Sequence, residues 1–167
     1  MDKTILLTAD AIASKLKRIA IEIVENNFVE KEIVLLGIVD RGAFIADCLK
    51  IELEKQNNWK VDVGYISIHK AAPLLHPVEL KLETSLENKV VILVDDVANS
   101  GKTMFYALKP LMDTYLKKLQ IAVLVDRQHK EFAITPDYVG ISISTTLQEM
   151  IFVQIGNEVK EPVAYLN

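Results

Sequence analysis

The sequence predicts an α/β fold in which a central, mainly parallel and twisted sheet is flanked by helices. Two observations predict this class. Apolar stretches rich in β-branched residues alternate with segments of helical periodicity, and three of those stretches end in a polar pair. Strands that are apolar on both faces need helices on both sides, joined by right-handed crossovers. With 167 residues, half of them hydrophobic, the chain is expected to form a single domain, 1–167.

The first half of the chain contributes two strand-helix steps. Thr8 or Asp10 is placed to cap a helix that reaches about Asn27 and lies across the sheet. The pattern then predicts a buried strand at 33–39, a helix at 43–55, a second strand at 61–68 and a loop at 69–77.

The second half continues the alternation and then changes character. We expect the central strand at 90–94, a helix at 101–118 that Pro110 kinks, and a further buried strand at 121–125. From Tyr138 onward the pattern consists of short extended pieces, at 139–143 and 150–155. These pieces predict a small separate flap, built mainly from 138–167.

The most informative stretch is 90–103, where the central strand runs into two carboxylates and then into a turn that opens a helix. Backbone N–H groups at a helix start, the hydroxyls of Ser100 and Thr103 and the cation of Lys102 form a cradle for a phosphate. Asp95 and Asp96 would repel that anion, but they suit a vicinal diol or a hydrated Mg²⁺ beside it. A sugar phosphate presents both groups.

Other interpretations of this stretch are weaker. The loop of ATPases needs a glycine five residues before Gly101, and that position holds Asp96. No G-x-G-x-x-G follows a predicted strand, so the dinucleotide fingerprint is absent as well. Two acids that merely end a strand, and a serine that merely caps a helix, would each be unremarkable alone. Their combination favours the sugar phosphate.

The stretch 94–103 resembles the phosphoribosyl pyrophosphate motif of the type I phosphoribosyltransferases. The resemblance covers nearly the whole chain. Residues 36–42 match the pyrophosphate loop of the family, and 124–131 with 136–140 look like the bifunctional pyrimidine-operon attenuators that have uracil phosphoribosyltransferase activity. The implied fold is the type I phosphoribosyltransferase fold, in which the C-terminal flap is called the hood.

The resemblance also implies roles for individual residues. Asp95, Asp96 and Arg41 are the expected catalytic residues. Three further sets follow from the matching motifs: phosphoribosyl pyrophosphate is expected to bind Asp95, Asp96, Val97, Ala98, Asn99, Ser100, Gly101, Lys102 and Thr103; the pyrophosphate loop comprises Asp40, Arg41 and Gly42; and the base pocket comprises Asp126, Arg127, Tyr138 and Val139. For Tyr138 a plain packing role is an equal alternative. A strained, sometimes cis, peptide is implied near Asp40.

The implied reaction displaces pyrophosphate from the anomeric carbon of the ribose by a ring nitrogen of a base. Carboxylates near the ribose would stabilise the cationic transition state, and Mg²⁺ is the expected cofactor, held mainly by the ligand and through water by Asp95 and Asp96. Purine enzymes of the family carry an acid where this chain has Asn99, and an amide cannot act as a general base. A pyrimidine such as uracil is therefore the expected base, as in pyrimidine salvage.

A second departure keeps an alternative function open. The attenuators carry an arginine and two acids in a mobile lid, and the matching segment here, 68–77, lacks all three. Weak turnover, or a regulator that only binds phosphoribosyl pyrophosphate or nucleotides, is the alternative to a pentosyltransferase. Lys70 is placed to replace the lost arginine in part, as a point charge. The chain lacks the motifs of kinases and of phosphatases, so these two functions rank last.

Composition bounds the partners and the compartment. The net charge of −4 and the residues 145–147, where a basic residue is expected, argue against RNA binding. A single cysteine, Cys48, and the lack of a long apolar run favour a cytoplasmic protein that does not enter membranes. The resemblance implies a homodimer or homotetramer.

Overall fold

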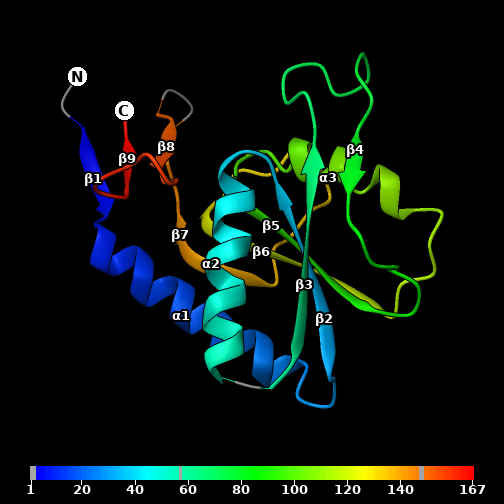
Figure 1. The fold of residues 1–167 in the computed structure, drawn as a ribbon. Coiled ribbons are helices and arrows are strands. Elements are labelled where there is room, and N and C mark those ends of the chain that lie inside the picture. Colours follow the sequence, from blue (N-terminus) through cyan, green and yellow to red (C-terminus); the bar gives the residue numbers. More distant parts are fainter. Residues whose placement is uncertain (1–2, 57, 147–148) are drawn as a thin grey trace.

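The computed structural model describes residues 3–56, 58–146 and 149–167, and it confirms the predicted α/β fold (Figure 1). Its elements in chain order are β1 (Thr4–Leu7), α1 (Ala9–Asn26), β2 (Glu32–Ile38), α2 (Arg41–Gln56), β3 (Lys60–Ser67), β4 (Glu79–Lys81), β5 (Val90–Ala98), α3 (Lys102–Ala107), the 3-10 turn η1 (Lys109–Leu111), β6 (Lys118–Arg127), β7 (Tyr138–Ile143), β8 (Ile151–Gln154) and β9 (Val163–Leu166).

Six of the strands form one sheet in the order β4-β3-β2-β5-β6-β7. All neighbouring pairs are parallel except β3 with β4, which is antiparallel. The chain enters at β2, builds outward through β3 and returns across the sheet to β5, so β2 and β5 lie at the centre, where strand order reverses. The carboxyl ends of central parallel strands at such a reversal form the usual ligand crevice of an open α/β sheet.

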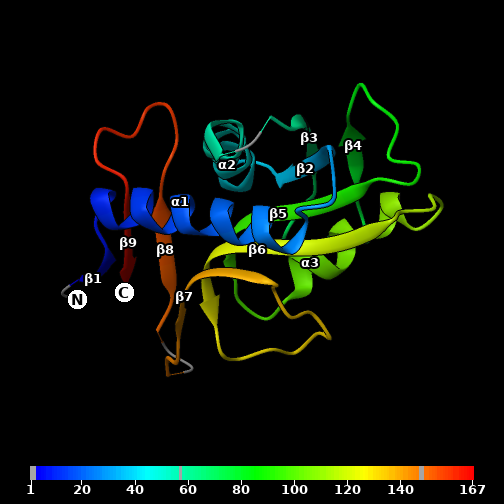
Figure 2. The same ribbon diagram turned by 90° about the horizontal axis from the view of Figure 1, so that it is seen from below.

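Two apolar layers cover the faces of this sheet. Alternate side chains of β2 point to opposite faces, so Ile33 and Leu35 pack in one cluster and Val34 and Leu36 in the other. The first cluster contains the buried faces of α1 and α2, and the second contains Met104, Ala107 and Leu111 from α3 and η1. Figure 2 shows α1 running alongside β6 and covering this face of the sheet.

The start of α1 confirms the predicted cap. Thr8 has an extended backbone, and its Oγ1 accepts a hydrogen bond from the N–H of Ala11 at 3.4 Å. The helix then buries the residues that recur at helical spacing, which are Ile12, Leu16, Ile19, Ala20 and Ile23. Asn27, immediately after the helix, is buried and donates from its side-chain amide to the carbonyl of Ile23.

The predicted helix at 101–118 is wrong in length. α3 ends at Ala107, the 3-10 turn η1 follows, and β6 already begins at Lys118. Pro110 lacks the N–H that a helix needs, and a proline disfavours helical geometry in the residue before it, so the helix stops where we expected only a kink. Pairing with β5 then extends β6 in both directions beyond the predicted 121–125.

The hood is a three-stranded antiparallel sheet in the order β1-β9-β8 (Figure 1). Two of its strands come from the C-terminal segment, as predicted. The predicted range, 138–167, begins too early, because β7 pairs in parallel with β6 and belongs to the main sheet. The N-terminal strand β1 was not predicted, since four largely exposed residues carry no periodic signal.

Two further differences concern the edge of the main sheet and the single cysteine. The short strand β4 was not predicted, because Glu79–Lys81 is mostly polar and pairs only with the edge strand β3. Cys48 lies on α2 and is half-buried, and this burial raises the pKa of its thiol. In the described part of the chain no helix is long and apolar enough to cross a membrane.

Candidate functional site

The two predicted acids lie inside the central strand rather than after it. β5 continues to Ala98, because its residues stay paired with β6 as far as Ala98 with Asp126. Asp95 is 1% exposed and Asp96 is 4% exposed. Two adjacent carboxylates buried at the carboxyl end of a central strand are costly unless cations or a ligand compensate them.

A cation compensates each of these carboxylates. Nη1 of Arg41, at the start of α2, lies 3.1 Å from Oδ2 of Asp96. Nζ of Lys70, from the loop between β3 and β4, lies 3.6 Å from Oδ1 of Asp95. The same Oδ1 accepts a hydrogen bond from the N–H of Asp96 at 2.9 Å. Side chains from three separate segments therefore converge on this end of β5.

Burial raises the pKa of Asp95 to about 8, and the neighbouring charge of Asp96 adds to this effect, while Lys70 opposes it. A protonated carboxyl can donate one hydrogen bond as well as accept others. Asp95 is therefore suited to a hydroxyl of a diol in either protonation state.

The predicted pyrophosphate loop packs directly against β5. A Cβ on Gly42 would lie 2.5 Å from the carbonyl oxygen of Val94, so only glycine allows this approach. The peptide bond between Val39 and Asp40 is cis, which agrees with the resemblance. The loop and Lys70 enclose a cavity of about 380 Å³ lined by Val39, Asp40, Arg41, Ile68 and Lys70. This cavity presents two cations beside the acidic pair.

The predicted phosphate turn forms a small concave loop. Residues Val97, Ala98, Asn99, Ser100, Gly101, Lys102, Thr103 and Met104 line a cavity of about 40 Å³. Gly101 has φ +83°, a conformation that side chains rarely adopt. The carbonyl of Ser100 accepts hydrogen bonds of 3.0 Å from the N–H groups of Glu131 and Phe132. These two anchoring residues were not foreseen, because they act through their backbone.

Arg127 connects the phosphate turn to the segment after β7. It is only 7% exposed. Its guanidinium donates to Oγ1 of Thr145 at 2.6 Å, to Oδ1 of Asn99 at 2.8 Å and to the carbonyl of Thr146 at 2.7 Å. The neighbouring Asp126 is engaged differently, by an ion pair with Lys130. Arg127 is thus placed at the predicted base side of the site.

The other two residues predicted for the base pocket, Tyr138 and Val139, lie at the start of β7. Tyr138 is 1% exposed, and its hydroxyl accepts a hydrogen bond from Nδ2 of Asn27 at 3.2 Å, beneath the end of α1. The backbone carbonyl of Val139 accepts a hydrogen bond from Arg18. In the register of the sheet Val123 pairs with Asp95 on one side and with Val139 on the other, so Val139 lies two strands away from Asp95 at the same level, and Tyr138 is opposite Ala122. Of the two roles left open for Tyr138, packing is the one that this position supports.

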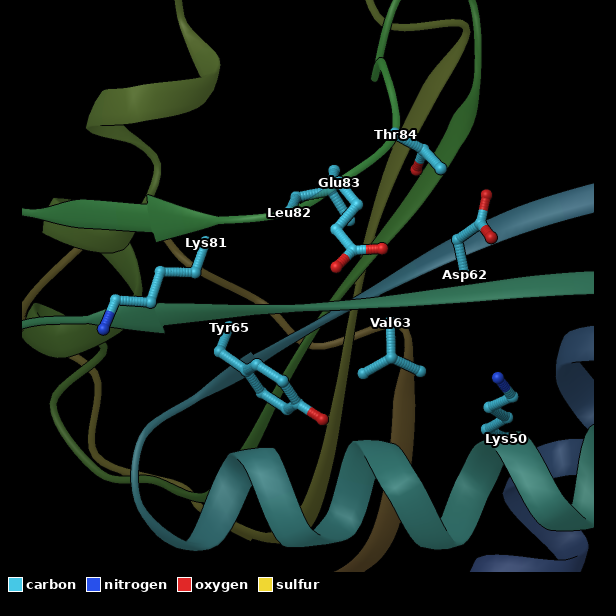
Figure 3. A pocket seen from close by; sticks show the side chains of 8 residues that line it. All are labelled: Lys50, Asp62, Val63, Tyr65, Lys81, Leu82, Glu83 and Thr84. Atoms are coloured by element: carbon cyan, nitrogen blue, oxygen red, sulfur yellow. The ribbon is translucent and has the colours of Figure 1, made fainter.

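Another cavity, of about 440 Å³, lies away from the acidic pair. Figure 3 shows its lining residues, which come from α2, β3 and the segment after β4: Lys50, Asp62, Val63, Tyr65, Lys81, Leu82, Glu83 and Thr84. Two lysines and two acids line it, so it has no net preference for an anion or a cation. The cavities beside Asp95 and Asp96 match a sugar phosphate better.

Comparison with known proteins gives consistent results. The sequence pattern of the phosphoribosyl transferase domain matches residues 3–160. A protein called bifunctional protein PyrR from Clostridium botulinum (strain Alaska E43 / Type E3) is 41% identical over 165 residues, which cover 94% of this chain and 91% of the relative. A protein of the same name from Macrococcus caseolyticus is 35% identical over 162 residues and covers 93% of each chain.

Solved structures agree on the fold. The hypoxanthine phosphoribosyltransferase of Trypanosoma cruzi superposes with a TM-score of 0.78 at 19% identity, over 96% of this chain and 95% of that chain. A hypoxanthine phosphoribosyltransferase from Staphylococcus aureus gives a TM-score of 0.70 at 21% identity, over 84% and 77%. At these identities the likeness concerns the fold alone.

Proposed function

Because this chain belongs to the phosphoribosyl transferase domain family, we propose that it transfers the 5-phosphoribosyl group from phosphoribosyl pyrophosphate to a nucleobase and releases pyrophosphate. The observation that carries this proposal is the buried pair Asp95 and Asp96, which lies between two cations from separate loops, Arg41 and Lys70, and a phosphate turn. A diol, a pyrophosphate and a 5-phosphate occur together in phosphoribosyl pyrophosphate, and each has a matching group at this site.

Each part of the ligand has a proposed place. The turn 99–103 binds the 5-phosphate through its backbone N–H groups and hydroxyls. The acidic pair accepts hydrogen bonds from the two ribose hydroxyls. Arg41 and Lys70 bind the pyrophosphate in the cavity that they line. Arg41 then has to exchange Asp96 for the pyrophosphate oxygens, which its half-exposed side chain permits.

The proposed reaction proceeds by positioning and electrostatics. The bond from the anomeric carbon to the pyrophosphate oxygen breaks as a ring nitrogen of the base attacks from the opposite side. Positive charge develops on the ribose, and the carboxylates next to its hydroxyls stabilise that charge. The electron pair of the broken bond leaves with the pyrophosphate, whose negative charge Arg41 and Lys70 offset, and the N–H proton of the attacking ring nitrogen passes to the departing pyrophosphate.

Mg²⁺ is the proposed cofactor. The carboxylates of Asp95 and Asp96 are oxygen ligands of the kind that Mg²⁺ prefers. Because Arg41 and Lys70 already contact these carboxylates, the two acids are proposed to bind Mg²⁺ through water molecules and not directly. When bound to the pyrophosphate, Mg²⁺ would neutralise part of the charge of the leaving group.

A pyrimidine such as uracil is the proposed base. Asn99 stands where the resemblance gives the 6-oxopurine enzymes an acid, and an amide does not supply that carboxylate. Relatives with 35% to 41% identity carry the name bifunctional protein PyrR, which agrees with a pyrimidine role. A role in pyrimidine salvage in the cytoplasm, and assembly into a homodimer or homotetramer, belong to the same proposal.

A regulator that binds the ligand without turnover is the second candidate. The loop 69–77 supports it, because this loop has no arginine or acid and its Lys70 is engaged with Asp95. His69 and His76 stack within the loop, with ring centroids 4.4 Å apart. RNA is not a proposed partner, since the net charge is −4.

The test measures pyrophosphate release from phosphoribosyl pyrophosphate with Mg²⁺. Uracil, hypoxanthine, guanine, xanthine and no base are compared in parallel, and the variant Asp95→Asn/Asp96→Asn is the negative control. Release that depends on one base and disappears in this variant supports the transferase. If no base gives turnover but the sugar donor raises the Tm of the wild type only, the regulator is correct. If phosphoribosyl pyrophosphate gives no turnover and does not raise the Tm of the wild type, both candidates fail.

A further inference from the structure

Arg127 and Asn99 form a contact that none of the proposed roles above uses. Arg127 ends β6 and is nearly buried, although it is a long charged side chain. Its guanidinium makes three hydrogen bonds, to Asn99, to the hydroxyl of Thr145 and to the carbonyl of Thr146. A buried guanidinium with three acceptors holds one orientation, so it is a rigid support for whatever contacts it.

This support determines which way the amide of Asn99 points. A guanidinium can only donate hydrogen bonds, so the atom of Asn99 that faces it, 2.8 Å away, must be the carbonyl oxygen Oδ1. The amide nitrogen Nδ2 therefore points away from Arg127. Within residues 3–56, 58–146 and 149–167 this nitrogen has no hydrogen-bond partner in the protein. Asn99 is exposed, so its two N–H donors are available to a ligand.

The position of Asn99 identifies the part of the ligand that it meets. It follows the acidic pair by three residues and directly precedes Ser100 of the phosphate turn. The pair and the turn hold the two sides of the ribose, and Arg127 and Thr145 come from the neighbouring β6 and the segment after β7. Asn99 is therefore placed between the acidic pair and the phosphate turn, on the side of Arg127, which the resemblance assigns to the base.

We propose that Arg127 is a positioning residue that holds the Asn99 amide with its N–H donors toward the base, and thereby selects bases that present a carbonyl oxygen beside the attacking nitrogen. This inference rests on the proposed function. A 2-oxopyrimidine that attacks through N1 has such an oxygen on C2. A 6-oxopurine that attacks through N9 has no carbonyl oxygen on either carbon next to that nitrogen. Either base loses its ring N–H proton on attack, and because the Asn99 amide cannot accept it, that proton passes to the departing pyrophosphate.

The substitution Asn99→Asp tests the hydrogen-bond donor of the Asn99 amide with the smallest possible change. The oxygen that faces Arg127 remains, and the nitrogen that faces the base becomes an oxygen. We expect the KM for uracil to rise by roughly 10-fold or more, because the base loses one hydrogen bond and meets a carboxylate instead. The ratio of uracil to hypoxanthine use falls. The new carboxylate lies in the phosphate turn and raises the Kd for phosphoribosyl pyrophosphate with either base, so the ratio between the two bases is the result that tests the inference.

The substitution Arg127→Lys tests the positioning role. Lysine keeps the charge but cannot hold three acceptors, so the amide of Asn99 is free to turn over. We expect the base preference to weaken and not to reverse, with a larger change in KM for the base than in kcat. Gln56→Glu is the control, because Gln56 is exposed at the end of α2 and the substitution changes the net charge as Asn99→Asp does.

Binding of product nucleotides supplies a readout that does not need turnover. The Tm shifts caused by UMP and IMP are measured on the wild type and on the three variants. A preference for UMP that falls in Asn99→Asp and Arg127→Lys, and remains in Gln56→Glu, supports the inference. An unchanged preference in Asn99→Asp, with phosphoribosyl pyrophosphate still bound, overturns the inference and leaves the proposed function standing. A wild type that binds neither the sugar donor nor the nucleotides overturns the proposed function itself.

Discussion

Nζ of Lys70 lies 3.6 Å from Oδ1 of Asp95, so a half-exposed cation from the loop 69–77 covers a fully buried carboxylate. The sequence predicted Lys70 only as a partial replacement for a missing arginine. Its contact with Asp95 gives it a second role. In the absence of a ligand, Lys70 covers the carboxylate that is proposed to bind the ribose diol. Entry of the ligand then requires Lys70 to move from Asp95 toward the pyrophosphate.

Replacement of Lys70 is expected to weaken binding of phosphoribosyl pyrophosphate. In Lys70→Ala the cavity of about 380 Å³ loses one of its two cations, and we expect the Kd to rise roughly 3- to 10-fold, the effect of one partly exposed charge. Lys70→Arg should restore most of the affinity. The Kd is measured by isothermal titration calorimetry with Mg²⁺ present. Lys50→Ala is the control, because Lys50 lines the other cavity, of about 440 Å³, and not the one beside the acidic pair. Equal Kd values for Lys70→Ala and the wild type would show that Lys70 does not contact the pyrophosphate.

The buried Asp95 is expected to make the stability of the free protein depend on pH. Its pKa is raised to about 8, well above the usual carboxyl value, so the folded state binds the proton more tightly than the unfolded state. The resulting stabilisation is complete below the unfolded pKa and is lost as the pH rises through about 8. Asp95→Asn removes this titration, and its Tm should exceed that of the wild type by more at pH 8.5 than at pH 5.

The comparison for this prediction is Asp113→Asn, because Asp113 is exposed in the loop after η1. Thermal unfolding of both variants and the wild type is followed at pH 5, 7 and 8.5. The Tm difference between Asp113→Asn and the wild type should stay nearly constant over this range. A Tm gain for Asp95→Asn that is largest at pH 5 would contradict the raised pKa.

The parts of the site that the sequence predicted are those whose residues lie close together along the chain. Asp95, Asp96 and the turn that follows occupy one continuous segment, so their spacing alone relates them. The same is true of Asp40, Arg41 and Gly42. The sequence could not show that Arg41 and Lys70 each reach one of the two acids, because these contacts depend on how β2, β3 and β5 lie beside one another.

The position of Tyr138 depends on long-range register. The resemblance implied a place in the base pocket for Tyr138, and a packing role was an equal alternative. The register of β7 against β6 instead sets it opposite Ala122, where its hydroxyl meets Asn27. The residues that do reach Arg127 are Thr145 and Thr146, at the other end of β7. A strand of six residues displaces its two ends by roughly 17 Å, so local sequence cannot decide which end faces the ligand.

Gly42 is expected to be essential for the shape of the pyrophosphate loop. In Gly42→Ala the new Cβ would lie 2.5 Å from the carbonyl oxygen of Val94 and 2.9 Å from Cα of Asp95, both in the rigid backbone of β5. The loop has to move away, and we expect a loss on the order of 1–3 kcal/mol in the free energy of unfolding. Because Arg41 is part of this loop and moves with it, the affinity for phosphoribosyl pyrophosphate should fall as well.

Gly140→Ala separates these two effects. Its Cβ would lie 2.3 Å from the carbonyl oxygen of Leu124, a comparable clash in β7. Urea unfolding should show a loss of stability for both variants, while the ligand-induced rise in Tm should be lost only in Gly42→Ala. If both variants keep the full ligand response, the loop 40–42 does not hold the pyrophosphate.

Mg²⁺ is expected to bind together with phosphoribosyl pyrophosphate and not before it. Among the described residues no group of three or more His, Cys, Asp or Glu side chains is arranged to hold a metal ion, and the acidic pair already contacts Arg41 and Lys70. Mg²⁺ alone should therefore leave the Tm unchanged at millimolar concentration, whereas Mg²⁺ with the sugar donor should raise it. Removal of Mg²⁺ with EDTA should abolish that rise, and Asp95→Asn/Asp96→Asn should show no rise under any condition. A Tm increase with Mg²⁺ alone that disappears in the double variant would instead place a metal site directly on the two acids, and the cations of Arg41 and Lys70 would then have to give way to the metal rather than to the pyrophosphate.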